Sequence, residues 1–215
     1  MLFRNRLDRT PMKKLLHIPY LLILFRLLLA PIILYLAFTL RNESRFILVI
    51  LIFLGLLSDI FDGIIARRQK ISTVTLRRMD SQVDLVFWLS IGVSCYLLNP
   101  GLIASHKTGI IIVIAMEVLC YVTSLLKFGK ETCTHAFLSK IWGILLFICC
   151  VSIIGFHYGG FLLEVTLFWG ILSQVDVLLI ILILPKWKND IPSCYHAYLI
   201  RKGIPFKRNR LLNDD

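Results

Sequence analysis

Six stretches of the chain are almost purely apolar, and polar or basic segments separate them. Each stretch has about 20 residues, which is the length that an α-helix needs to cross the ~30 Å hydrocarbon core of a bilayer. The pattern therefore predicts six transmembrane helices, which we place at 19–40, 46–66, 80–98, 108–128, 136–156 and 161–184. Open strands are excluded there because unpaired backbone groups are too costly in lipid.

The composition also indicates a membrane protein. Of the 215 residues, 58% are hydrophobic and 17% are charged, and the mean hydropathy is +0.80. A soluble domain has about a quarter charged residues. The predicted fold class is therefore all-α and integral to the membrane. We expect a basic interfacial segment at 1–18, one six-helix membrane domain at 19–184 and a basic cytoplasmic tail at 185–215. A solvated basic tail is the alternative for 1–18.

Positive charge is concentrated in alternate connections. Twenty of the 24 Lys and Arg residues lie in the segments 1–18, 67–78, 127–140 and 186–215. The positive-inside rule places these segments in the cytoplasm, and with six helices both termini lie there. Because no targeting peptide is recognisable, we expect a bacterial inner membrane.

Four aspartates lie at the predicted cytoplasmic ends of the second and third helices: Asp59, Asp62, Asp80 and Asp84. A carboxylate within a membrane helix costs at least ~2.5–3.5 kcal/mol on insertion scales, so it needs a partner or a role. Spacings of three and four place each pair on one helix face. Four adjacent carboxylates repel one another unless cations lie between them, and oxygen ligands favour Mg2+ or Mn2+. We therefore predict one or two divalent ions in a polar cleft at these helix ends.

Small and basic residues accompany the acids. Gly63 follows directly after Asp62. A glycine in a helix costs about 1 kcal/mol relative to alanine, which indicates that a ligand approaches the backbone there. Ala66 lies on nearly the same face, and Arg67 has a planar guanidinium that suits phosphate oxygens. Together these residues predict a pyrophosphate site. The alternative is a group of helix-end acids neutralised by neighbouring arginines.

The pattern Asp59-x2-Asp62-Gly63-x2-Ala66-Arg67, followed by Asp80-x3-Asp84, resembles the class I CDP-alcohol phosphotransferase signature DxxDGxxARx8GxxxDxxxD. Seven of its eight fixed positions match. The run from Ile18 to Arg26, followed by Pro31, is similar to the beginning of the family's first helix. The resemblance implies six helices with a cytoplasmic active site. It also implies transfer of a phosphatidyl-type group from CDP-diacylglycerol to a small alcohol, with release of CMP, in phospholipid biosynthesis.

The resemblance further implies a role for each acid. Asp59, Asp62 and Asp80 would hold divalent ions, two Mg2+ or Mn2+ ions as the resemblance implies, that bind the CDP pyrophosphate. Asp84 would complete the metal site and act as the catalytic general base on the acceptor hydroxyl.

The substrate-binding residues that the resemblance implies are Gly63, Ala66, Arg67 and Lys140. The first two would let the cytidine part approach the backbone, and Arg67 would steady the nucleotide side of the donor. Lys140, at the start of the fifth helix, would meet the lipid phosphate or the acceptor; alternatively it snorkels to lipid headgroups. His135 is a weaker candidate for the same substrate-binding role. A homodimer is consistent with the family.

The sequence departs from the family at three positions. Leu76 replaces the second glycine of the signature, and Tyr20 and Ile23 stand where the family usually has Asn and Thr. A bulky residue at position 76 would reshape or block the nucleotide pocket, so a degenerate, inactive homologue is one alternative. A non-catalytic membrane partner is another.

Two further acids, Glu117 and Asp176, lie within apolar runs, and we expect Arg26 to pair with one of them across helices. Together with the four aspartates, these two acids also suggest a cation or proton path, and thus an ion-coupled transporter as an alternative function. The clustering of the acids at one end and the absence of inverted repeats argue against it. The acceptor is left open among glycerol 3-phosphate, serine, inositol, inositol phosphate and another phospholipid.

Overall fold

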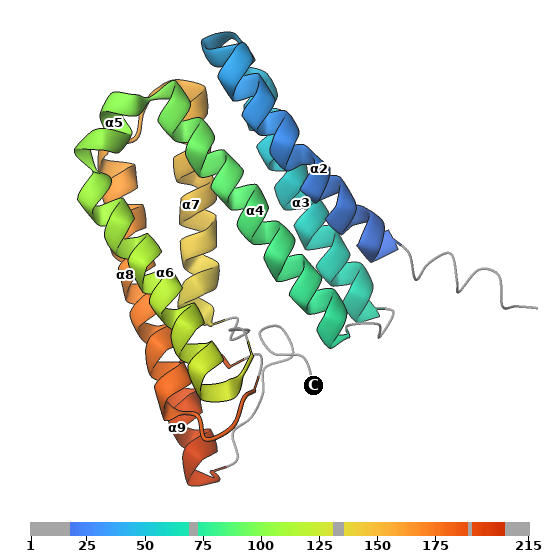
Figure 1. The fold of residues 1–215 in the computed structure, drawn as a ribbon, viewed down its shortest axis with the longest axis vertical. Helices are drawn as coiled ribbons and strands as arrows, with labels where there is room; N and C mark the ends of the chain where they lie inside the picture. Colours follow the sequence, from blue (N-terminus) through green and yellow to red (C-terminus); the bar gives the residue numbers. More distant parts are fainter. Residues whose placement is uncertain (1–17, 69–72, 131–135, 189–190, 205–215) are drawn as a thin grey trace, which may run out of the picture. The chain divides into compact units, whose positions relative to one another are not determined.

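The structure is a computed structural model that describes residues 18–68, 73–130, 136–188 and 191–204 (Figure 1). Within these ranges the side chains of four residues are not described: Arg67, Val74, Thr75 and Arg77. Of the predicted interfacial segment 1–18, all but Ile18 lies outside the described residues. His135 and the end of the predicted tail, from residue 205 on, also lie outside them.

The described residues form helices and no strand. In chain order the elements are α2 (Ile18–Thr39), η1 (Arg41–Ser44), α3 (Arg45–Arg68), α4 (Val74–Leu98), α5 (Pro100–Ser105), α6 (Lys107–Phe128), α7 (Phe137–Phe156), α8 (Gly160–Ile183) and α9 (Cys194–Lys202).

Six segments are long and apolar enough to cross a membrane: Ile18–Thr39, Arg41–Ala66, Arg78–Leu98, Lys107–Phe128, Phe137–Phe156 and Gly160–Ile183. They coincide with the six stretches predicted from the sequence, to within a few residues at each end. The all-α, integral membrane fold class is thus confirmed. The sequence pattern does not predict α9, which lies within the range assigned to the tail.

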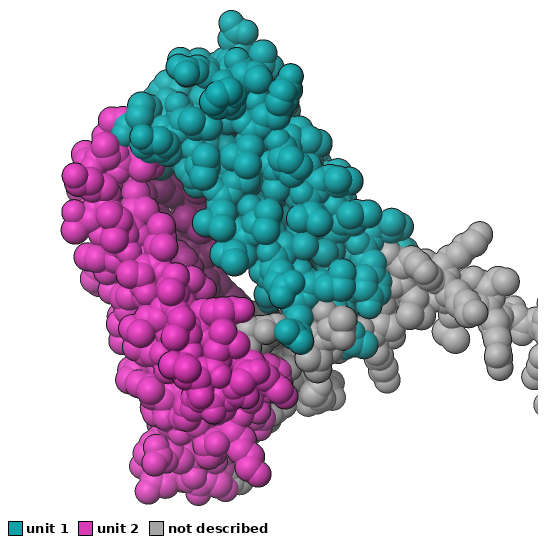
Figure 2. Space-filling model, viewed as in Figure 1, with its two compact units in different colours: residues 1–100, 153–157 teal, residues 101–152, 158–215 magenta. Residues whose placement is uncertain are grey.

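The chain divides into two compact units, residues 1–100 with 153–157 and residues 101–152 with 158–215 (Figure 2). The first unit contains α2, η1, α3, α4 and the last turn of α7. The second contains α6, α8, α9 and most of α5 and α7. The single membrane domain at 19–184 stays a prediction.

In the first unit, α2 packs against both α3 and α4 (Figure 1). Each helix contributes apolar side chains at intervals of three and four residues, which is the spacing of one helix face. The largest fully buried ones are Ile33 of α2, Leu48 and Ile52 of α3, and Phe87 and Ile91 of α4. The three helices therefore share one apolar core.

Gly55 of α3 makes room for the ring of Phe87 from α4. A Cβ atom at Gly55 would lie 2.1 Å from the Cζ atom of Phe87, well inside van der Waals contact. Phe87 is buried, so its ring has little freedom to move away. Gly55 lies one helical turn before Asp59, and Phe87 lies one turn after Asp84. This contact therefore helps to align the two helices that carry the acids.

Arg45 forms several hydrogen bonds at the end of the first unit that lies away from the acids. Its Nη1 atom donates to the carbonyl oxygen of Ile154 at 2.9 Å, and its Nη2 atom donates to Asn42 Oδ1 at 3.0 Å. Nη2 also lies 2.9 Å from His157 Nδ1. Partial desolvation lowers the pKa of His157 below its usual value, and the positive charge of Arg45 lowers it further. A neutral imidazole can accept this hydrogen bond, so Arg45 joins α3 to the end of α7.

In the second unit, α8 packs against α6 and α9. Gln174 of α8 donates from Nε2 to Glu117 Oε2 of α6. The buried Asp176 accepts the backbone N–H of Cys194, at the start of α9, on Oδ1 at 2.9 Å. A carboxylate is favourable there because helix N-termini carry unpaired N–H groups and partial positive charge. Arg26 instead pairs with four aspartates of the first unit, so the expectation that it pairs with Glu117 or Asp176 is wrong.

Gly55→Ala is expected to destabilise the protein, because the new methyl group displaces the buried ring of Phe87. Overpacking of this kind costs about 1–3 kcal/mol. The measurement is the free energy of unfolding, or the midpoint of thermal unfolding, of the purified protein in detergent.

The matched control is Gly92→Ala in α4. A Cβ atom at Gly92 meets nothing within 4 Å, so this variant should be neutral or slightly stabilised. The double variant Gly55→Ala with Phe87→Leu should recover part of the loss. Equal stability of Gly55→Ala and Gly92→Ala would contradict the contact.

Candidate functional site

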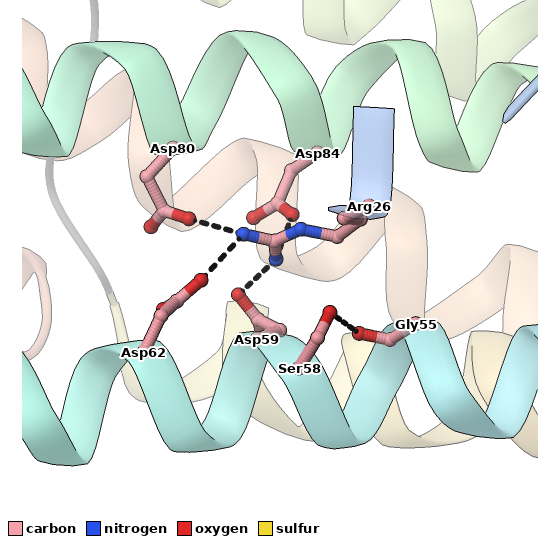
Figure 3. Close-up of polar contacts among 7 residues, drawn as sticks. All are labelled: Arg26, Gly55, Ser58, Asp59, Asp62, Asp80 and Asp84. Carbon is pink, nitrogen blue, oxygen red and sulfur yellow. Dashed lines mark hydrogen bonds and ion pairs between the residues drawn. The ribbon is translucent and has the colours of Figure 1, made fainter. Parts of the chain in front are cut away.

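Three helices bring charged side chains to one point in the first unit (Figure 3). Asp59 and Asp62 project from α3, and Asp80 and Asp84 project from α4. The spacings of three and four residues put each pair on the face that looks toward the other helix. Arg26 of α2 reaches between them. The four acids that the sequence placed together are thus brought together by the fold.

The guanidinium of Arg26 contacts all four carboxylates. Its Nη1 atom pairs with Asp59 and Asp84. Its Nη2 atom donates to Asp62 Oδ2 at 2.9 Å and to Asp80 Oδ1 at 2.5 Å. Each terminal nitrogen therefore joins one carboxylate of α3 to one of α4, so that a single side chain bridges both helices.

The cluster has a buried side and a more open side. The side chains of Arg26 and Asp62 are 1% and 5% exposed. In contrast, the side chains of Asp59, Asp80 and Asp84 are 38%, 29% and 33% exposed. Arg26 carries one positive charge, so it cannot by itself balance four ionised carboxylates. Charge of this density in a partly buried place favours further cations.

Three of the acids can hold a metal ion. Asp59, Asp62 and Asp80 each offer a carboxylate oxygen, and these oxygens lie within 4.8 Å of one another. A ligand set made only of carboxylates suits hard ions such as Mg2+ and Mn2+. The residues therefore fit a divalent cation. Asp84 is not in this group of three, and its role as a metal ligand stays a prediction.

The small residues of the motif lie beside the acids. Gly63 is half-buried directly after Asp62. Ala66 is buried in an apolar cluster with Ile23, Leu76 and Val83. Leu76 is the expected departure from the signature and Ile23 an expected departure in the first helix, and the fold places both in this one cluster. Leu76 is thus a core residue here, 5% exposed.

Two predicted substrate-binding residues are placed only in part. Arg67 lies in the last turn of α3, and its side chain is outside the described residues. Lys140 is an exposed residue in the first two turns of α7, in the second unit. Their binding roles stay predictions.

Sequence reasoning missed the role of Arg26. A buried arginine in an apolar helix needs carboxylate partners, and from the sequence we assign it Glu117 or Asp176. The signal was the number of acids: four aspartates between positions 59 and 84 need a cation more than either isolated acid does.

A family model described as CDP-alcohol phosphatidyltransferase matches residues 16–183. This range covers well over half of the chain and includes all six candidate spans and the whole acidic cluster. The chain belongs to the CDP-alcohol phosphatidyltransferase family. No curated protein and no solved structure matches it. The family implies transfer of a phosphatidyl group from a CDP-alcohol in lipid synthesis and is generally dependent on divalent metals. Helix α9 lies beyond the matched residues.

Divalent ions are expected to raise the thermal stability of the protein, because an ion that binds only the folded state stabilises it. The measurement compares the unfolding midpoint in detergent with Mn2+ and with chelator. Asp62→Asn should reduce the Mn2+-dependent shift by at least half.

Glu117→Gln is the matched control, because it neutralises a membrane carboxylate whose partner is Gln174 rather than the acidic cluster. This variant should keep the full shift. A shift that is lost equally in both variants would argue against metal binding by the cluster.

Proposed function

We propose that this protein transfers a phosphatidyl group from CDP-diacylglycerol to a small alcohol and releases CMP. The single observation that carries the proposal is the convergence of Asp59, Asp62 and Asp80 on one point, in a chain that belongs to a family with this chemistry. Membrane helices seldom contain so many acids without a function.

The three converging aspartates are proposed to hold one or two divalent ions against the donor pyrophosphate. When bound, Mg2+ or Mn2+ would neutralise the pyrophosphate oxygens and the charge that develops on the departing CMP. The carboxylates of α3 and α4 would orient the donor so that its β-phosphorus faces the acceptor. Phosphoryl-type transfer depends mainly on such positioning and charge neutralisation.

Asp84 is proposed as the general base. Its side chain is 33% exposed and lies one helical turn after Asp80, so it is accessible to an incoming hydroxyl next to the metal ligands. A carboxylate at this place accepts the proton of the alcohol as the new oxygen–phosphorus bond forms.

The remaining motif residues are proposed to bind the donor and the acceptor. Gly63 and Ala66 would let the nucleotide lie close to the backbone of α3, and Arg67 would contact its phosphates. Lys140 would bind a lipid phosphate or the acceptor.

The contacts of two lysines bear on which alcohol is the acceptor, because a phosphorylated acceptor would need extra cations. Lys127 Nζ donates to the carbonyl oxygens of Ile181 and Leu182 at 2.9 and 2.7 Å, at the end of α8. Lys130 Nζ lies 4.8 Å from the ring centroid of Trp187. Both cations therefore have structural partners, which favours an acceptor that does not need them, such as serine or inositol.

The positive-inside pattern supports a reaction at the cytoplasmic leaflet with both termini in the cytoplasm. We further propose a bacterial inner membrane as the location and a homodimer as the assembly.

Purified protein in detergent is expected to release CMP from CDP-diacylglycerol when Mg2+ or Mn2+ and the correct alcohol are present. Asp84→Asn should lower kcat by at least ~100-fold, because general-base catalysis contributes that much. The assay measures CMP with a panel of alcohols, with and without chelator.

Glu117→Gln serves as the control and should keep near-normal activity. Release of CMP that persists in Asp84→Asn would exclude Asp84 as the base. Cation flux without any CMP release would instead support a transporter.

Leu76→Gly is expected to lower the KM for CDP-diacylglycerol, because removal of this side chain opens space beside Ala66. The same change should lower stability, since it removes a buried side chain and places glycine in a helix. The measurement pairs donor kinetics with thermal unfolding.

Val83→Ala is the matched control, because Val83 belongs to the same apolar cluster but not to the signature. It should lose stability and leave the KM for the donor unchanged. A similar change of KM in both variants would show that Leu76 acts through packing alone.

A further inference from the structure

We propose that Arg26 is an exchangeable counterion: its guanidinium pairs with the four aspartates in the metal-free protein and leaves them when a divalent ion binds. This inference rests on the proposed function, because it takes the aspartates to be the metal ligands. It assigns to α2 a part in metal binding, although α2 contributes none of the carboxylates.

The guanidinium and a metal ion would use the same carboxylates. Arg26 contacts Asp59, Asp62 and Asp80, and these are the three acids whose oxygens lie within 4.8 Å of one another (Figure 3). Mg2+ binds carboxylate oxygens at ~2.0–2.1 Å. The Nη2 atom of the guanidinium lies 2.9 Å from Asp62 Oδ2 and 2.5 Å from Asp80 Oδ1, between the two helices. An ion at the centre of these oxygens therefore needs the space that the guanidinium fills.

Electrostatics opposes simultaneous occupancy. A unit positive charge and a divalent ion only a few ångströms apart repel strongly in a partly buried site, where solvent screens them poorly. Once the ion neutralises the carboxylates, the attraction that holds the guanidinium among them also weakens. Both effects favour exchange over joint binding.

The guanidinium of Arg26 forms hydrogen bonds and ion pairs with carboxylates alone. Its four terminal contacts all go to aspartates, and its buried Nε atom has no hydrogen-bond partner. Arg45, also a buried arginine of this unit, likewise has an Nε atom without a partner, but its terminal nitrogens bind a backbone carbonyl and an asparagine side chain. Arg26 thus lacks a neutral anchor that would keep it in place after the carboxylates bind a metal ion, and its long side chain can reorient.

The test compares Mn2+ binding by the wild-type protein, Arg26→Met and Arg45→Gln, each purified in detergent and freed of metal with chelator. Free Mn2+ is measured by electron paramagnetic resonance during a titration. If Arg26 competes with the ion, Arg26→Met should bind Mn2+ about tenfold more tightly or better. Arg45→Gln removes a comparably buried arginine from the same unit and should bind Mn2+ as the wild type does.

Arg26→Lys covers the case in which Arg26→Met does not fold without metal. Lysine keeps one positive charge on a single nitrogen, which cannot bridge four carboxylates as the planar guanidinium does. Its Mn2+ affinity should lie above that of the wild type. In addition, the unfolding midpoint of each Arg26 variant should rise more with Mn2+ than the wild-type midpoint does.

The outcomes separate the two proposals. If the wild type binds Mn2+ and no Arg26 variant binds it more tightly, the exchange is overturned. Weaker binding by these variants would make Arg26 a residue that positions the carboxylates around the ion. Absence of Mn2+ binding in every protein would overturn the metal site of the proposed function and the exchange with it.

Discussion

One guanidinium among four carboxylates connects the three helices of the first unit, and the placement of the acidic motif depends on it. None of these charges would be stable alone within a membrane span, so α2, α3 and α4 must meet at this level. Because lipid tails are as apolar as these side chains, burial of apolar surface alone gives the helices little preference for one another in lipid. The paired charges supply that preference, because each terminal nitrogen of Arg26 joins α3 to α4.

Apolar contacts enclose this charged layer on both sides along the helices. Toward the helix middles, the ring of Phe87 lies against the backbone of Gly55. Toward the helix ends, Leu76 packs with Ile23, Ala66 and Val83. The two bulky residues Ile23 and Leu76, at which the sequence predicts departures from the family pattern, belong to the same cluster. They are therefore best understood as one linked change in packing rather than as two separate losses of motif residues.

The second unit deals with its charges in another way. Glu117 is paired with Gln174, Asp176 binds the N-terminus of α9, and Lys127 binds carbonyl groups at the end of α8. Each of these groups obtains a neutral hydrogen-bonding partner, which lowers the cost of its burial. The first unit instead gathers four acids around one cation. This contrast supports assigning the chemistry to α3 and α4 and a structural role to Glu117 and Asp176.

The sequence by itself determined the six spans, the pairing of acids on two helix faces and the family resemblance. These are local properties: hydropathy over about 20 residues identifies a span, and spacings of three and four place side chains on one face. The partner of Arg26, the burial of Leu76 against Ile23 and the docking of α9 on Asp176 were decided only by the tertiary structure. Such contacts depend on the rotation and depth of each helix relative to its neighbours, and these follow from packing between residues far apart in the chain.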